Sequence, residues 1–503
     1  MSVVPFKKDP VEFNQRAFFA TNIFDVLPTD HECYIYEDIF DQLDTSNVEK
    51  NYSVRGQNAY HPRLITGILV YGYSQGVFSS RQIEKRCNED LGYMFISHCN
   101  CPNFRVLSDF RKEHYEFFKD CFKQSVMLAR EAGLVKLGHV SLDGSKFKAA
   151  TSKHKAMSYG RLKDKEKELT EEIEQLIAKA ISCDMEEDER YHDKTGNEIP
   201  EELKIKEKRL AKIKSAKEAL EKRERQLHPD EEIDDKKQIS FADHEARIMG
   251  KNGHFEYAYN GQISVDEANQ IIVGQHLSLN ANDKEEVSAA LIEIKGTTDD
   301  LPDEMSLDNG YMSGSNLESF KDKQIDVYIA TGSGEKKDQR PVDESDRKIK
   351  KSDFVYDEDR DCFVCPAGKA LELQRHGSDG AKVYKAIKEQ CDGCPYKSRC
   401  WGSKKGEPRT IKTDDKEALR QEMIKKMEQE SSKEKYKKRK KIVEPAFGQI
   451  KNSGFRGFSV RGHNKAGGEF SLVCAVHNIK KIIRAIIKGV VCVEAGKLIP
   501  IAV

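Results

Sequence analysis

The 503-residue sequence predicts a layered α/β domain that is preceded by helices and interrupted by two insertions. Apolar residues repeat at helical spacing before residue 135, strand and helix patterns alternate around a core region, and leucines recur at seven-residue steps within that core region. A chain of this length is long enough for two to four domains and a sizeable core. We therefore expect several units built around one layered α/β core.

The first expected unit, residues 1–135, is helical. Leu64, Ile68 and Tyr71 recur at helical spacing, and a second helical pattern follows Gly76. Short helices with turns and basic tips are typical of DNA-binding modules, although an ordinary helical bundle with solvated charges shows the same pattern. The candidate DNA-contacting side chains in this unit are Arg81, Arg105 and Arg111.

A short first part of the core is expected at residues 136–156. His139 to Leu142 alternate as in a β-strand, and the carboxylate Asp143 follows them. Gly144 then permits a sharp turn or a close approach of two backbones. An acidic residue at the end of a strand is well placed for chemistry, so Asp143 is a candidate site residue.

Residues 157–228 are rich in Glu and Lys and are predicted to form a coiled-coil hairpin inserted after the first strand. An internally paired hairpin and an arm for dimerisation or DNA gripping both fit this pattern. The loop between the two helices contains Gly196 and Pro200. The expected seam consists of Leu162, Leu169, Ile173 and Leu176 in the first helix and Leu203, Leu210, Ile213, Leu220 and Leu227 in the second.

The core is expected to continue over residues 229–334. Two or three alternating β runs, with Asn-Gly and Asp-Glu as turn signals, precede a helix. A further short strand then ends at Asp308, before a glycine turn, another helix and the strand-like stretch DVYIAT. Asp308 therefore repeats the setting of Asp143, since both carboxylates follow short apolar strands and precede glycine-containing turns.

Residues 335–430 are expected to form a polar, turn-rich insertion that holds a cysteine cluster. Two C-x₂-C pairs joined by a loop are typical of zinc sites, because each pair can present two thiolates to one tetrahedral ion. We favour a structural Zn²⁺ ion bound by four cysteines that each lie near a turn residue. The alternatives are a site made of the two C-x₂-C pairs and a set of free buried thiols. The favoured set is Cys365, Cys391, Cys394 and Cys400, and the alternative set is Cys362, Cys365, Cys391 and Cys394.

The last expected unit, residues 431–503, holds the stretch KEKYKKRKKIVEPAFGQIK, in which cations surround the carboxylate Glu444. Glu444 and Lys451 are seven residues apart and share a face of a helix. Two strand-end aspartates and one helical glutamate can converge on a hard cation such as Mg²⁺ or Mn²⁺, which lets a carboxylate and an anionic phosphodiester coexist. A solvated basic helix with one ion pair is the alternative.

Composition limits the classes of protein that fit. The net charge of −1 argues against a simple basic nucleic-acid binder, although blocks such as KYKKRKK and DMEEDER create strong local fields. The sequence has no apolar run of about eighteen residues or more, so no membrane span is predicted. The N-terminus lacks the apolar core of a secretory signal. Thirteen scattered cysteines favour a reducing compartment, so we expect a cytoplasmic protein.

The stretches YKKRKKIVEPAFGQIK, VSLDGSKF and SLDNGY together resemble the DDE transposases of bacterial insertion sequences, whose third acidic residue lies in a Tyr-Arg-Glu-Lys signature. The N-terminal stretches HPRLITGILVYGYSQGVFSSRQIEKRCNEDLGYMFI and CPNFRVLSDFRKEH resemble the helical domain that commonly precedes the catalytic core, and VRGHNKAGGEFSLVCAVHNIKKI resembles the usual C-terminal tail. A Cys-Pro-Ala-Gly element like the one at Cys365 also occurs in these transposases. The resemblance covers nearly the whole chain apart from the hairpin.

The resemblance implies a ribonuclease-H-like catalytic fold and assigns roles to six residues. The expected Mg²⁺ or Mn²⁺ ligands are Asp143, Asp308 and Glu444, and the remaining signature members, expected to contact DNA phosphates, are Tyr436, Arg439 and Lys451. Lys451 is also expected at the site of catalysis. Four residues separate Arg439 from Glu444, where the best-known signature has three.

The function implied is metal-dependent cleavage and strand transfer at the ends of a mobile element. The expected partners are double-stranded DNA, at the element ends and the target, and a second copy of the chain as a homodimer on DNA. A non-catalytic DNA-binding regulator and a nuclease that does not join its products are the alternatives. The regulator shares the basic tract and the helical N-terminus, whereas the nuclease shares the metal site.

Overall fold

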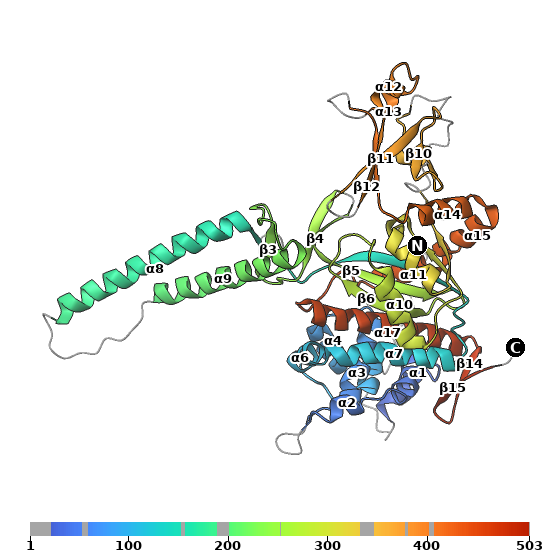
Figure 1. Cartoon of the computed structure of the whole chain (residues 1–503). Coiled ribbons are helices and arrows are strands. Elements are labelled where there is room, and N and C mark those ends of the chain that lie inside the picture. Colours follow the sequence, from blue (N-terminus) through green and yellow to red (C-terminus); the bar gives the residue numbers. More distant parts are fainter. Residues whose placement is uncertain are drawn as a thin grey trace, which may run out of the picture.

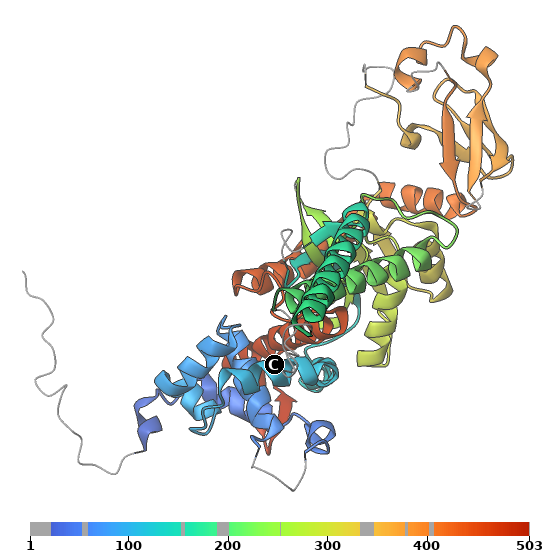
Figure 2. The same ribbon diagram turned by 90° about the vertical axis from the view of Figure 1, so that its left-hand side faces the viewer.

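The structure is a computed structural model that describes residues 22–52, 59–151, 156–188, 201–251, 253–331, 347–377, 381–401 and 407–501. A six-stranded sheet lies at the centre of the molecule, and N-terminal helices pack at one end of it (Figure 1). A pair of long helices projects to one side, and a second, smaller sheet lies beyond the opposite end. Seen from the side, the smaller sheet stands clear of the rest of the molecule (Figure 2).

The central sheet has the order β4-β5-β1-β7-β8, and β6 pairs with β5. Strand β1 is antiparallel to β5 and parallel to β7, and β7 is in turn parallel to β8. The strands are β1 (His139–Lys148), β4 (Arg247–Lys251), β5 (His254–Asp266), β6 (Ile272–Ser278), β7 (Glu304–Leu307) and β8 (Asp326–Ile329). Of the two Asn-Gly pairs in this region, the one at 252–253 separates the paired strands β4 and β5, as expected, whereas Asn260 and Gly261 lie inside the long strand β5 and make no turn.

Helices cover both faces of this sheet. On strand β6 a Cβ at Gly274 would lie 2.9 Å from Ile294 of α10 (Val287–Thr298), whereas Gln275 donates a hydrogen bond of 2.9 Å to Ser471 of α17 (His463–Ile487). Adjacent residues of a strand point to opposite faces, so α10 and α17 lie on opposite sides. Helix α16 (Arg439–Asn452) packs on β1 and β5, and α11 (Gly314–Asp322) connects β7 to β8.

The N-terminal helices share one continuous hydrophobic core with the sheet and α17. Helix α17 is buried along most of its length because it lies between the sheet and these helices. A Cβ at Gly468 of α17 would lie 2.6 Å from Tyr115, so the two helices approach closely there. The N-terminal elements are η1 (Ile23–Val26), α1 (Glu32–Phe40), α2 (Ser46–Glu49), α3 (Pro62–Ser74), α4 (Ser80–Glu89), α5 (Leu91–Ile96), α6 (Phe104–Glu113) and α7 (Tyr115–Glu131).

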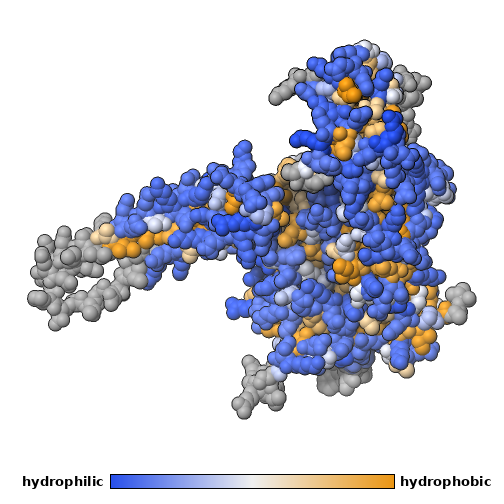
Figure 3. Space-filling view, in the orientation of Figure 1, coloured by the Kyte–Doolittle hydropathy of each residue, from blue (hydrophilic) through white to orange (hydrophobic). Residues whose placement is uncertain are grey.

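The projecting pair consists of α8 (Tyr159–Asp188) and α9 (Glu201–Leu227), which lie side by side over a small core of their own. A narrow hydrophobic stripe between hydrophilic flanks follows the pair in Figure 3. Leu162, Leu169 and Leu220 are buried as expected, but Leu227 is exposed because it is the last residue of α9. The predicted loop with Gly196 and Pro200 lies outside the described residues.

The smaller sheet is an antiparallel series of five strands in the order β13-β12-β11-β10-β9. Its core consists of six buried residues and is separate from the main core. The strands are β9 (Val355–Asp357), β10 (Cys362–Val364), β11 (Ala370–His376), β12 (Lys382–Ala386) and β13 (Thr410–Thr413), and two short helices, α12 (Lys388–Cys391) and α13 (Lys397–Cys400), join β12 to β13.

The chain returns to the central sheet through α14 (Glu417–Glu428) and α15 (Glu430–Lys437), both of which contact β8. It ends in the hairpin of β14 (Val491–Glu494) and β15 (Lys497–Pro500), and a second pair of short strands, β2 (Ala156–Ser158) and β3 (Gln238–Ser240), lies at the base of the projecting helices. Among the described residues, no helix combines the length and the apolar character that crossing a membrane requires.

Candidate functional site

The two predicted aspartates come together on neighbouring parallel strands. Leu142 of β1 pairs with Leu307 of β7, and the next residue on each strand is an aspartate. The carboxylates of Asp143 and Asp308 therefore stand beside each other at the carboxyl end of β7. Asp308 is exposed and its side chain accepts a hydrogen bond of 2.8 Å from the backbone N–H of Asn309.

Asp143 is not at the end of its strand, which corrects the expectation from the sequence. Strand β1 continues to Lys148 because β5 pairs with it along its whole length. Gly144 therefore makes no turn. A Cβ at this position would lie 2.8 Å from the Asp283 carboxylate, so the glycine permits a close approach of side chains from the neighbouring strand and loop.

Helix α16 carries Glu444 to the same place. Its apolar side chains, including Val443 and Phe447, are buried against the sheet, and this orientation leaves Glu444 about half exposed, at 48%. Arg439, at the start of the helix, is only 10% exposed and joins the two carboxylates. One guanidinium nitrogen lies 2.8 Å from Asp143, and the other lies 3.3 Å from Glu444.

The charges of this cluster act on one another. Burial raises the pKa of Asp143, which is 20% exposed; Arg439 lowers that pKa, and the neighbouring Asp308 raises it. Burial also raises the pKa of Tyr436, which Arg439 opposes and which Asp308, Asp143 and Glu444 raise further. All three carboxylates are therefore close enough to one tyrosine to change its ionisation, and they form one electrostatic site.

The remaining signature residues lie around the carboxylates, but not on one helix. Tyr436 belongs to α15, which ends at Lys437, and Arg439 begins α16. Lys451 lies on α16 almost two turns beyond Glu444, where its amino group donates a hydrogen bond to Ser145 of β1. That amino group also lies 5.3 Å from the ring centre of Phe147 and 5.7 Å from that of Phe447.

The site contains carboxylate oxygens that suit a hard cation, but they do not yet stand in metal-binding positions. Within the described ranges, no three His, Cys, Asp or Glu side chains are already positioned to hold a metal ion. Instead, the guanidinium of Arg439 lies between two of the carboxylates and supplies the positive charge there. The carboxylate oxygens of Asp143, Asp308 and Glu444 are the groups that could bind Mg²⁺ or Mn²⁺.

Reasoning from the sequence missed a fourth carboxylate, Asp283, close to β1. It accepts hydrogen bonds of 2.7 Å from the side-chain amides of Asn260 and Gln262, and Lys146 lies 4.0 Å away. Asp283 follows β6 in a polar loop, where nothing in the local pattern separates it from other acidic residues. Its position next to Gly144 makes it a support for the strand that carries Asp143.

The three candidate arginines of the N-terminal helices fall into two groups. Arg81 and Arg105 are exposed and both lie against the ring of Phe104, at 4.6 and 5.9 Å from its centre. Arg111 is buried, and its guanidinium donates hydrogen bonds of 2.6 Å to the hydroxyls of Tyr73 and Ser80. The expectation that Arg111 contacts DNA is therefore corrected, because its charge is enclosed between helices.

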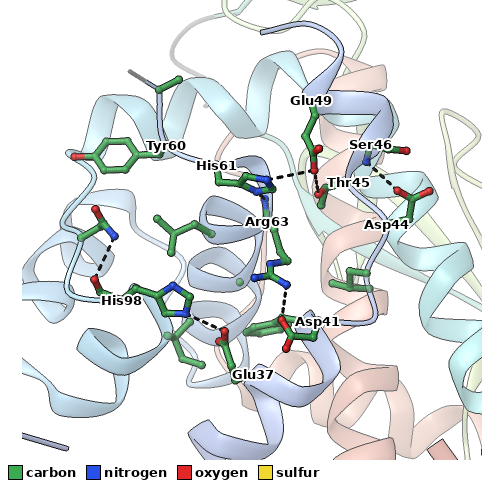
Figure 4. A pocket seen from close by; sticks show the side chains of 17 residues that line it. Glu37, Asp41, Asp44, Thr45, Ser46, Glu49, Tyr60, His61, Arg63 and His98 are labelled. Atoms are coloured by element: carbon green, nitrogen blue, oxygen red, sulfur yellow. Dashed lines mark hydrogen bonds and ion pairs between the residues drawn. The ribbon is translucent and has the colours of Figure 1, made fainter. Parts of the chain in front are cut away.

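A cavity of about 570 Å³ lies among the N-terminal helices and not at the carboxylates of the sheet (Figure 4). His98 lies 2.9 Å from Glu37, His61 lies 3.5 Å from Glu49, and Arg63 pairs with Asp41. Acidic side chains outnumber arginines and lysines in its lining, so the cavity is unsuited to a DNA phosphate.

The four cysteines of the favoured zinc set lie around a small cavity at one end of the smaller sheet. Cys362 does not line that cavity. It is buried in β10, where its nearest charged neighbours include Arg360 and Asp357. The structure thus brings together Cys365, Cys391, Cys394 and Cys400.

Two protein-family models match parts of the chain. Residues 364–483 match a family described as "Transposase DDE domain", and residues 21–113 match a family described as "Transposase domain (DUF772)". No curated protein and no solved structure matches the chain. The first match includes Arg439 and Glu444 but neither aspartate, and the second includes the helices that carry the three arginines. Two separate regions of the chain are thus similar to transposase families.

Proposed function

We propose that this protein is a DDE transposase that binds the ends of its mobile element, cleaves DNA there and joins the freed ends to target DNA. The observation that carries the proposal is the register between β1 and β7, which sets Asp143 beside Asp308, with Glu444 linked to Asp143 through Arg439. Similarity of two separate regions to transposase families supports the same reading.

The strand order supports a ribonuclease-H-like core. In the sheet, β5 is antiparallel to β1 on one side and to β4 and β6 on the other, and β7 and β8 follow on the far side of β1, parallel to it. A later helix, α16, then lies against β1. In this scheme the projecting helices and the smaller sheet are insertions into a single core.

The donor set fits a divalent cation. Three carboxylates offer hard oxygen ligands, and the guanidinium of Arg439 already lies between two of them, so the site attracts positive charge. Bound Mg²⁺ or Mn²⁺ would supply Lewis acidity and activate a water or a 3′-hydroxyl for attack on phosphorus. Asp143, Asp308 and Glu444 would hold it.

The other residues of the site would position DNA. Lys451 extends along β1 next to Ser145, two residues beyond Asp143, where its charge can hold a phosphate beside the cleavage point. Tyr436 lies within electrostatic reach of Arg439, and Arg439 itself can release Glu444 and bind a phosphate bidentately, because guanidinium geometry matches phosphate. DNA thus replaces contacts that the carboxylates make in its absence.

Cleavage and joining on candidate element ends test the proposal. The full-length protein is incubated with end-containing and control DNA, with Mg²⁺ and with EDTA, and both nicked and joined products are measured. Asp143→Asn, Asp308→Asn and Glu444→Gln should each abolish cleavage, whereas Glu434→Gln, at an exposed glutamate of α15, is the matched control and should cleave normally. Wild-type cleavage by all three variants would refute the proposal.

Two other outcomes identify the alternatives. End binding that is salt-sensitive but unaffected by EDTA and by the three carboxylate variants, without any cleavage, would mark a DNA-binding regulator. Cleavage that requires Mg²⁺ and the carboxylates but never joins its products to a second DNA would mark a nuclease. Joining of ends to target DNA is the result that separates a transposase from both.

A further inference from the structure

Four sulfur side chains from three segments meet beside the smaller sheet. Cys365 follows β10, Cys391 and Cys394 lie at the end of α12 and just after it, and Cys400 ends α13. All four line one cavity of about 30 Å³, together with apolar side chains such as those of Phe354 and Leu371. A cavity of this size has room for a single ion.

The backbone around these cysteines forms two tight turns. The N–H of Lys369 donates to the Cys365 sulfur at 3.3 Å, and the N–H of Gly368 donates to the Cys365 carbonyl at 2.8 Å. In the second turn, the N–H of Cys394 donates to the Cys391 carbonyl at 3.2 Å. Glycines at the two turns, Gly368 and Gly393, have positive φ angles of 73° and 77°, which a glycine adopts without strain.

The four sulfurs are close enough to influence one another. Burial raises the pKa of the Cys391 thiol, and the nearby Cys394 and Cys365 raise it further. Burial likewise raises the pKa of Cys400; Arg409 opposes this rise, and the other three cysteines add to it. Four thiolates in this apolar surrounding would repel one another, so the cysteines can lose their protons together only around a bound cation.

Cys362 is excluded by the alternation of side chains along β10. Phe363 points into the small core and is fully buried there, so Cys362 points to the opposite face of the sheet. The side chain of Cys365 packs against the same core as Phe363. The simpler pairing of the first two C-x₂-C motifs is therefore not the one that the fold brings together.

The hydrophobic core that stabilises the smaller sheet is small. That core contains six buried side chains, and the strands that surround it are short. Units this small bury too little apolar surface to be stable and usually depend on a metal or on disulfides. The cysteines concerned are free thiols, so disulfides do not supply that support.

We propose that Cys365, Cys391, Cys394 and Cys400 bind one structural Zn²⁺ ion that holds the smaller sheet and its two short helices together. Four thiolates give the closed tetrahedral set of a structural site, with zinc–sulfur distances of about 2.3 Å. Across the part of the chain that the structure describes, no three such side chains already stand in metal-binding positions, so these sulfurs turn into the cavity on binding. Each thiol releases its proton to solvent as its sulfur binds the ion.

The test measures zinc in the purified full-length protein grown with zinc and dialysed against a metal-free buffer. Wild-type protein should contain about one zinc per chain, and Cys391→Ser and Cys400→Ser should lose most of it. Cys362→Ser is the matched control, with the same substitution three residues from a ligand, and should keep the full amount. Co²⁺ in place of Zn²⁺ should show thiolate-to-metal charge-transfer absorption and intense tetrahedral bands.

Two results would overturn the proposal: wild-type protein that takes up neither zinc nor cobalt, or loss of zinc in Cys362→Ser with retention in Cys400→Ser. If the serine variants are insoluble, the wild type still decides, since a mercurial that binds thiols should release about one zinc per chain as it modifies the four cysteines. Zinc content is independent of DNA cleavage, so this proposal and the proposed transposase activity can fail separately.

Discussion

The molecule contains two clusters in which an arginine meets carboxylates, and they differ in what surrounds them. In the first, Arg111 and Glu469 lie 3.6 Å apart with exposures of only 5% and 2%, between the N-terminal helices and α17. In the second, Arg439 joins Asp143 to Glu444, and Glu444 is half exposed. Both arginines were candidate DNA contacts in the sequence and both are buried, but only Arg439 is paired with a carboxylate that is half exposed.

The hydrogen bonds explain the difference. Glu469 accepts from the Tyr73 hydroxyl at 2.7 Å and from the backbone N–H and hydroxyl of Ser459 at 2.8 and 2.6 Å. Glu444, by contrast, contacts Arg439 at 3.3 Å and leaves about half of its side chain to solvent. A carboxylate that is fully bonded inside the protein holds the fold together, whereas one that is half exposed and weakly bonded is available to a ligand.

The largest expected effect separates the clusters by activity. Asp143→Asn or Glu444→Gln should reduce cleavage by about 10³-fold or more, because each removes a charge from the metal site while keeping the shape of the side chain. Neither change should lower the thermal unfolding temperature appreciably, since Glu444 is half exposed and burial already raises the pKa of Asp143. Cleavage assays and thermal unfolding of the same preparations check this pair of expectations. A large loss of stability would place these carboxylates with the structural cluster.

The second effect separates the arginines by stability. Arg111→Met should lower the free energy of unfolding by about 3–5 kcal/mol, because it leaves the buried carboxylate of Glu469 without its cation. Arg439→Met should cost less, about 1–3 kcal/mol, because Glu444 is half exposed and Asp143, whose pKa burial raises, can take up a proton once the cation is lost. Denaturant unfolding of both variants measures the difference. Equal losses would contradict the distinction between a closed and an open cluster.

How far the sequence predicts this fold depends on whether a signal is local. The helical spacing of the N-terminal unit, the strand before Asp308 and the helix around Glu444 are local signals, and the structure has helices or a strand at each of these places. The extent of β1 is not local, because β5, far along the chain, determines how long the pairing continues. For the same reason an Asn-Gly signal predicts the turn at 252–253 but not the continuation of β5 through Asn260 and Gly261, which pairing with β1 and β6 determines.

The candidate site shows the same limit. Residue type and spacing made the two aspartates, Glu444 and Lys451 candidates, and the resemblance to DDE transposases selected them from the many other charged residues. They could not show that Arg111 is enclosed, because its partner Glu469 is more than three hundred residues away. Asp283 was missed because it acts through Asn260 and Gln262, whose side chains face it only after β5 and β1 have paired.

The third effect concerns a buried histidine of α17 and the pH dependence of stability. His477 of α17 is buried, with its ring nitrogen 2.9 Å from the Gln270 carbonyl, and burial lowers its pKa to about 4. The histidine of the unfolded chain takes up a proton near pH 6.5, whereas that of the folded chain does so only near pH 4. The free energy of unfolding is therefore fully retained above pH 6.5 and decreases as the pH falls toward 4.

Between pH 7.5 and 5, this histidine should account for a loss of about 2 kcal/mol in the free energy of unfolding. His477→Gln should remove that part of the pH dependence, and His376→Gln, at an exposed histidine of β11, is the matched control. Urea unfolding at both pH values measures the change. An unaltered pH dependence in His477→Gln would show that the ring takes up its proton without unfolding the chain.

The smallest expected effect tests whether the exposed arginines of the N-terminal helices bind DNA. Arg105→Ala should weaken binding to all DNA sequences alike and reduce the slope of log affinity against log salt by about 1, because it removes one phosphate contact. Arg81→Ala should do the same, and both should leave thermal stability within about 0.5 kcal/mol, since each side chain is exposed beside Phe104. Titrations at several salt concentrations measure the slope. A slope unchanged in both variants would show that neither Arg81 nor Arg105 contacts a DNA phosphate, and the exposed tips of these two helices would then lie outside the DNA interface.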